Sequence, residues 1–233
     1  MPIQHQPVLW WGTAVLSTLR QFGPLPHRGH ECEVLSCGNE AAESEHAWKN
    51  CTKNSGHNKF IPASEFCADH LPEWVRYPWM LDYVKLVFDL TVRLRVTFTS
   101  WERPKGYSFH NYRGSDSLQV GSGFVQDVSL VQEPCLCRAC KNSLTPAQEW
   151  FCMYIETACH VVFDRKEAKA TKVDLFYDDE SSLTNGRMKT IFALDTVVQS
   201  KDKDLSVLLC ATHDKSIGRK MLDNKKSWIG YFI

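Results

Sequence analysis

The sequence predicts a mainly β fold (α+β overall), with an antiparallel β-barrel or half-barrel that follows a Cys/His-rich, partly helical extension. From Leu118 onward, short apolar runs recur every 10–20 residues or so with no helical periodicity between them, which is typical of an antiparallel sheet folded on itself. Before Leu118 one segment has helical spacing, and residues 30–70 hold four cysteines and four histidines but few long apolar side chains.

Five strands are predicted in the second half of the chain from alternating or continuous apolar runs. Asn185-Gly186 marks a tight turn between two of them. The predicted strands are Leu118–Val131, Cys152–Ala158, Thr171–Tyr177, Thr190–Val198 and Leu205–Cys210.

The extension contains one amphipathic helix and one strand. Trp79 to Phe88 carries apolar residues at helical spacing, and Leu90 to Thr99 alternates apolar and polar residues without a slip. The apolar end Trp228–Ile233 fits either a closing strand or a chain that stops within a domain. We therefore divide the chain into an apolar leader and linker (1–29), a Cys/His-rich segment (30–70), a helix-plus-strand extension (71–115), a barrel (116–213) and a basic and apolar tail (214–233).

Composition excludes several classes of partner. Lys+Arg and Asp+Glu balance at 27 each, so there is no general basic field that would attract nucleic acid. No run of about 18 apolar residues predicts a membrane span. The apolar stretch Val8–Leu16 has no basic residue before it, unlike a secretory signal, which favours a cytoplasmic location. A protein or peptide partner remains.

Three motifs occur in order along the predicted barrel. They are Gly121-Ser122-Gly123-Phe124-Val125, then Thr157-Ala158-Cys159-His160-Val161-Val162, then Asp202-Lys203-Asp204-Leu205-Ser206-Val207-Leu208-Leu209. Together they resemble the N-terminal half of a trypsin-like (chymotrypsin-fold) serine peptidase, with its opening strand, its histidine motif and its aspartate motif. The resemblance covers roughly residues 116–212 and implies a barrel of the trypsin-like type.

The resemblance implies roles for two residues. His160 would be the general base and Asp204 the carboxylate that fixes its tautomer and orientation. Their separation in the sequence is close to the roughly 45 residues between His and Asp in the chymotrypsin triad.

The third member of the triad has no counterpart. No Gly-Asp-Ser-Gly stretch occurs in the sequence, and the chain ends roughly 30 residues after Asp204, where the triad would need about 93. We therefore expect an incomplete homologue without nucleophile or oxyanion hole, hence without proteolysis. A half-barrel would also expose a sheet edge through which the chain could associate.

A second cluster could hold a metal ion. Cys135, Cys137 and Cys140, followed by Cys152, offer four thiolates for a structural zinc ion, and the two-residue gap between Cys137 and Cys140 suits one ion. Disulfides and free thiols are the open alternatives; by resemblance to the family, a disulfide could include Cys159. The competing interpretation of the chain is accordingly a zinc- or disulfide-stapled interaction module without catalytic ancestry.

Overall fold

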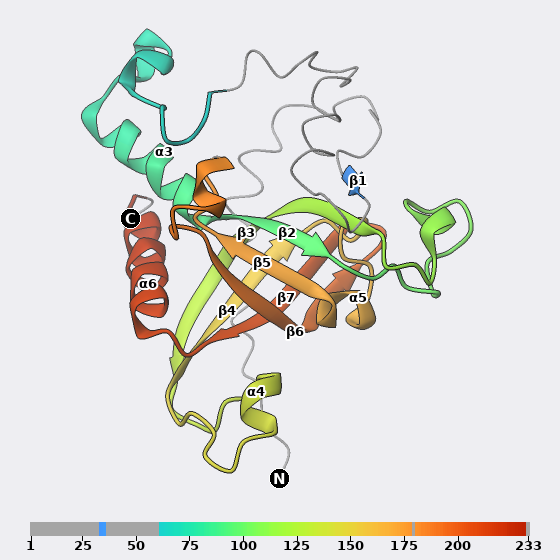
Figure 1. Cartoon of the computed structure of the whole chain (residues 1–233). Coiled ribbons are helices and arrows are strands. Elements are labelled where there is room, and N and C mark those ends of the chain that lie inside the picture. Colours follow the sequence, from blue (N-terminus) through green and yellow to red (C-terminus); the bar gives the residue numbers. More distant parts are fainter. Residues whose placement is uncertain (1–32, 36–60, 179, 232–233) are drawn as a thin grey trace. The chain divides into compact units, whose positions relative to one another are not determined.

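Six antiparallel strands close into a β-barrel (Figure 1). The computed structural model describes residues 33–35, 61–178 and 180–231, all within one compact unit that spans Cys32–Ile233. The barrel strands are β2 (Thr91–Val96), β3 (Leu118–Val131), β4 (Trp150–Thr157), β5 (Thr171–Leu175), β6 (Lys189–Ser200) and β7 (Leu205–Thr212).

The strands follow one another around the barrel in the order β3-β2-β5-β6-β7-β4, and pairing of β3 with β4 closes it. A short strand, β1 (Glu33–Leu35), adds to Leu118–Val120 of β3. The predicted mainly β fold and its five strands are confirmed. Closure removes sheet edges. The open edge through which we expected a half-barrel to associate is therefore not present in these six strands.

The barrel begins earlier in the chain than residue 116. Strand β2, which we assigned to the extension, pairs with both β3 and β5 and is an integral barrel strand. Its alternation has the usual cause, because Val92, Leu94 and Val96 are buried in the main hydrophobic core. On the other face, Arg95 forms a two-point ion pair with Asp174 of β5, at 2.6 and 2.8 Å.

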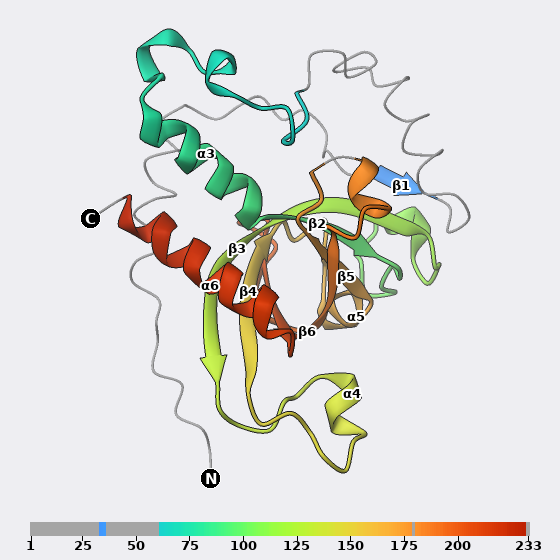
Figure 2. The same ribbon diagram turned by 60° about the vertical axis from the view of Figure 1, so that its left-hand side comes forward.

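Two longer helices pack beside the barrel and against each other (Figure 2). Helix α3 (Pro78–Leu90) confirms the predicted amphipathic helix and runs directly into β2. Helix α6 (Lys215–Gly230) occupies the segment where we allowed a closing strand, so that expectation is wrong for Trp228–Gly230. Asp214 caps α6, since its carboxylate accepts the N–H groups of Ser216 and Ile217.

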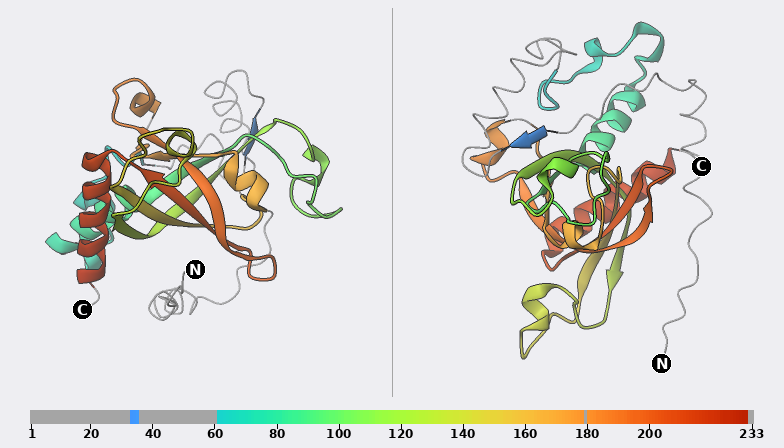
Figure 3. Two further views of the ribbon diagram at one scale, coloured as in Figure 1. Left: turned by 90° about the horizontal axis from the view of Figure 1, so that it is seen from below. Right: turned by 90° about the vertical axis from the view of Figure 1, so that its right-hand side faces the viewer.

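The β3–β4 connection is a long hairpin loop that projects from the barrel (Figure 3). It carries the single helical turn α4 (Arg138–Lys141). Another short helix, α5 (Arg165–Lys169), precedes β5. The 3-10 turns are Ala68–His70, Glu73–Val75, His110–Tyr112 and Glu180–Leu183.

Several sequence-based expectations lie outside the described residues. They concern the apolar leader and linker (1–29) and most of the Cys/His-rich segment, including Cys32, Cys37 and Cys51. Among the helices that the structure describes, none combines the length and the apolar character needed to cross a membrane.

Lys225 gives the fold a pH dependence. It is 6% exposed on α6 with its amine 3.9 Å from the Trp228 ring centroid, and burial lowers its pKa to about 8. The unfolded chain keeps this proton up to its ordinary pKa of 10.5, so the free energy of unfolding rises with pH between about 8 and 10.5. We expect the free energy of unfolding to rise by at most about 3 kcal/mol over this range. The rise is measured by urea unfolding at several pH values, as the difference between the wild type and Lys225→Met. Equal pH profiles for the two proteins would contradict it.

Candidate functional site

The histidine motif lies at the point where β4 ends. After Thr157 the chain turns, with the N–H groups of Val161 and Val162 both donating to the carbonyl of Ala158, at 3.0 and 3.2 Å. Val161 packs against Gly121 of β3, where an added Cβ would lie 2.6 Å from a Val161 methyl carbon. The glycine of the first motif therefore makes room for the segment that carries the second motif.

His160 and Asp204 form a two-point contact. The Asp204 Oδ2 atom lies 2.5 Å from His160 Nδ1, and its Oδ1 atom accepts the His160 backbone N–H at 2.8 Å. Asp204 ends the β6–β7 turn with φ 48°, a left-handed conformation that aspartate tolerates. Because an ionised carboxylate only accepts hydrogen bonds, Nδ1 carries the proton of a neutral imidazole, and Nε2 is then an acceptor.

A buried ion pair holds the backbone of the histidine segment. Arg103 and Glu167 have fully buried side chains and meet through two contacts of 2.6 Å. Arg103 also donates to the carbonyl oxygen of His160 at 3.0 Å, and Glu167 accepts the N–H of Phe163 at 2.8 Å. The loop before β3 and helix α5 thus fix the position of His160. Sequence reasoning missed this pair, because a charged residue in a loop or on a short helix gives no sign of being buried.

One of the two nucleophile substitutes that the sequence offers lies in an unsuitable environment. Cys159 is completely buried, and burial raises its pKa even though a hydrogen bond with Tyr107 opposes the shift. A buried thiol with a raised pKa is a poor nucleophile. Ser122 is exposed on β3, where it pairs with Arg93 of the neighbouring strand β2.

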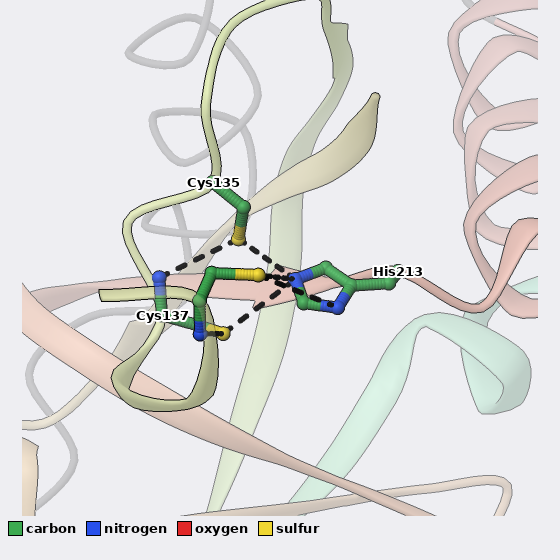
Figure 4. Close-up of side chains that lie close together, drawn as sticks. Cys135, Cys137 and His213 are labelled. Atoms are coloured by element: carbon green, nitrogen blue, oxygen red, sulfur yellow. Dashed lines mark hydrogen bonds between the residues drawn. The ribbon is translucent and has the colours of Figure 1, made fainter. Parts of the chain in front are cut away.

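A second cluster joins the β3–β4 hairpin to the end of β7. Cys135, Cys137, Cys140 and His213 each bring one ligand atom to within 4.8 Å of the others (Figure 4). The His213 Nε2 atom lies 2.8 Å from the sulfur of Cys135 and 3.5 Å from the sulfurs of Cys137 and Cys140. This set could bind a metal ion.

The thiols of the cluster differ in acidity. Burial raises the pKa of Cys135 to about 12. Burial also opposes ionisation of Cys137, but its pKa is lowered overall because the backbone N–H of Cys140 and the two neighbouring thiols donate hydrogen bonds to it.

Cys152, which we expected as the fourth ligand, does not belong to this group. It lies in β4, 4% exposed, and packs with Trp150 against Cys135 and Cys140. Its place is taken by His213, which follows the last residue of β7 and precedes the α6 cap. The sequence signal was a lone histidine between a strand and an aspartate cap, remote from the cysteines along the chain.

The Cys/His-rich segment contributes one described pair. The Cys67 sulfur lies 3.5 Å from His70 Nδ1, and both residues are exposed. The other cysteines of residues 30–70 are outside the described part of the chain.

Comparison with known proteins adds no assignment. No protein-family model matches the chain, and no curated protein matches it.

Proposed function

We propose that the chain is a trypsin-like serine peptidase homologue that keeps the histidine and aspartate of a catalytic triad but does not cleave peptide bonds. The observation that carries the proposal is the two-point contact of Asp204 with His160. It provides what a general base needs, a fixed tautomer with Nε2 as the acceptor. The closed six-stranded barrel is consistent with a chymotrypsin-like barrel.

The lack of proteolysis follows from the missing nucleophile. The sequence contains no Gly-Asp-Ser-Gly stretch, and the serine loop of such peptidases also supplies oxyanion-hole N–H donors. Cys159 is buried with a raised pKa. Ser122 belongs to the opening motif, which puts it before the histidine, whereas the family order is His, Asp, Ser. On this proposal the chain supplies the general-base half of a catalytic apparatus.

Activity is tested by incubating the purified chain with casein and with a serine-reactive fluorophosphonate probe, beside active trypsin. We expect neither cleavage nor covalent labelling, since the probe needs an activated serine. The His160→Ala variant is the matched control. Labelling of the wild type that the variant loses would overturn the proposed inactivity.

A silent protein does not by itself support the general-base geometry, so the tautomer of His160 is measured separately by ¹⁵N NMR. We expect the Nδ1–H tautomer in the wild type and a loss of this preference in Asp204→Asn. Asparagine tolerates the left-handed backbone of Asp204, so the variant tests the carboxylate rather than the turn. A wild-type Nε2–H tautomer would contradict the proposed role of the pair.

The competing function, an interaction module stapled by zinc or disulfides, draws on the Cys/His cluster. The cluster fits this function only weakly, because a staple is compatible with either interpretation and requires no contact between His160 and Asp204. Structural zinc together with an unfixed His160 tautomer would favour the interaction module.

A further inference from the structure

We propose that Cys135, Cys137, Cys140 and His213 form a structural zinc site that ties the β3–β4 hairpin to the start of helix α6. The geometry of the four ligand atoms is the first argument. Zinc bonds of about 2.3 Å to sulfur and 2.05 Å to nitrogen, at tetrahedral angles, place sulfur and nitrogen ligands about 3.6 Å apart. Two of the three distances from sulfur to His213 Nε2 are 3.5 Å, and the third is 2.8 Å.

The surroundings of the sulfur atoms are the second argument. Each of the three accepts a backbone N–H at 3.4 Å, from Cys137, Cys140 and Ala147 respectively. Such donors stabilise the negative charge of a thiolate, which is the form that binds a metal. The backbone N–H groups of the loop therefore surround the sulfurs in the way that outer hydrogen-bond donors surround the ligands of a metal site.

The ligand set selects the metal and its role. Three thiolates and one imidazole suit zinc better than the hard cations calcium and magnesium, which prefer oxygen. Four protein ligands leave no open position for water or substrate, so the ion is structural rather than catalytic.

The site explains how the hairpin is held. The loop exposes Leu136 and Leu144, and its buried side is made largely of Cys135 and Cys140, beside Trp150 and Cys152. With so little apolar material, a metal supplies the stability that a core would otherwise give. Beyond the cluster, an ion pair of 2.7 Å between Glu149 and Lys215 joins the end of the hairpin to the first residue of α6.

Zinc content is measured by plasma mass spectrometry on the full chain purified without chelators. The readout is the difference between variants, because residues 30–70 contain further cysteines and histidines. We expect Cys140→Ala and His213→Ala each to hold one zinc fewer per chain than the wild type. Cys152→Ser is the matched control from the same cluster and should keep the wild-type content. Equal zinc in all four proteins, or loss in the control as well, would overturn the site.

A rescue variant separates ligation from folding. His213→Cys restores a fourth ligand, so its zinc content should return to the wild-type level. If His213 had only a structural role, a thiol at this position would not restore the zinc content. Cobalt substitution of the wild type should give the visible bands of a tetrahedral thiolate site. We expect zinc affinity to fall by more than about 100-fold in His213→Ala, since even outer-shell losses cost 10–100-fold. Unreactive, disulfide-linked cysteines at 135, 137 and 140 would refute the proposal.

Discussion

Replacing Arg103 by methionine is expected to lower the free energy of unfolding by about 3–5 kcal/mol. The substitution leaves the Glu167 carboxylate fully buried, so water cannot solvate the charge that Arg103 no longer balances. It also removes the donor to the carbonyl oxygen of His160. Urea unfolding followed by circular dichroism at pH 7 measures the change.

Two controls distinguish the buried charge from lost packing. Arg165 pairs with Asp195 on the surface and its side chain is 68% exposed, so Arg165→Met should cost far less stability than Arg103→Met. In the double variant Arg103→Met/Glu167→Gln, the neutral amide removes the uncompensated charge and still offers an oxygen to the N–H of Ser100 or Phe163. We expect it to be more stable than Arg103→Met alone. A double variant that is less stable would show that shape, not charge, dominates at this site.

The barrel strands were predictable because, in a strand with one buried face, every second residue is apolar. Val92, Leu94 and Val96 alternate with polar residues, and all three lie in the core. What the alternation could not reveal was the pairing partner of β2, which lies in β5 as well as β3. For that reason the strand was identified but placed in the extension rather than in the barrel.

The His160–Asp204 contact was anticipated through motifs, whereas the metal cluster was anticipated only in part. Cys135, Cys137 and Cys140 are close in the sequence, so their proximity in space is a local matter. His213 joins them only because β7 pairs with β4 and so returns the chain to the base of the hairpin. The sequence around a histidine does not show which distant strand its own strand pairs with, so His213 could not be predicted as a ligand.

Helix α6 was missed because one core position holds a lysine. Ile217, Met221 and Trp228 face the barrel core at helical spacing, but Lys225 interrupts the apolar stripe. The structure accommodates it by laying the amine over the Trp228 ring, 3.9 Å from its centroid. The basic character of the segment therefore hid an amphipathic helix.

The close approach of α6 to β4 leads to the second large effect, which we expect from Gly218→Ala. A Cβ at Gly218 would lie 2.1 Å from the ring of Phe151, a residue buried in the core. Alanine should gain about 1 kcal/mol of helix propensity over glycine, but the overlap forces the ring or the helix to move. Overpacking of this kind costs typically 1–3 kcal/mol and occasionally more. We expect a net destabilisation of about 2 kcal/mol.

Gly230 provides the opposite case in the same helix, and the pair of variants separates propensity from packing. Apart from the adjoining residues and the backbone of the helix itself, no atom in the described part of the chain lies within 4 Å of a Cβ built at Gly230, so Gly230→Ala should be neutral or stabilising by up to about 1 kcal/mol. Thermal and urea unfolding of both variants measure the two changes, and only Gly218→Ala should be destabilising. If Gly218→Ala were also stabilising, helix α6 would not be packed on Phe151 as closely as the structure has it.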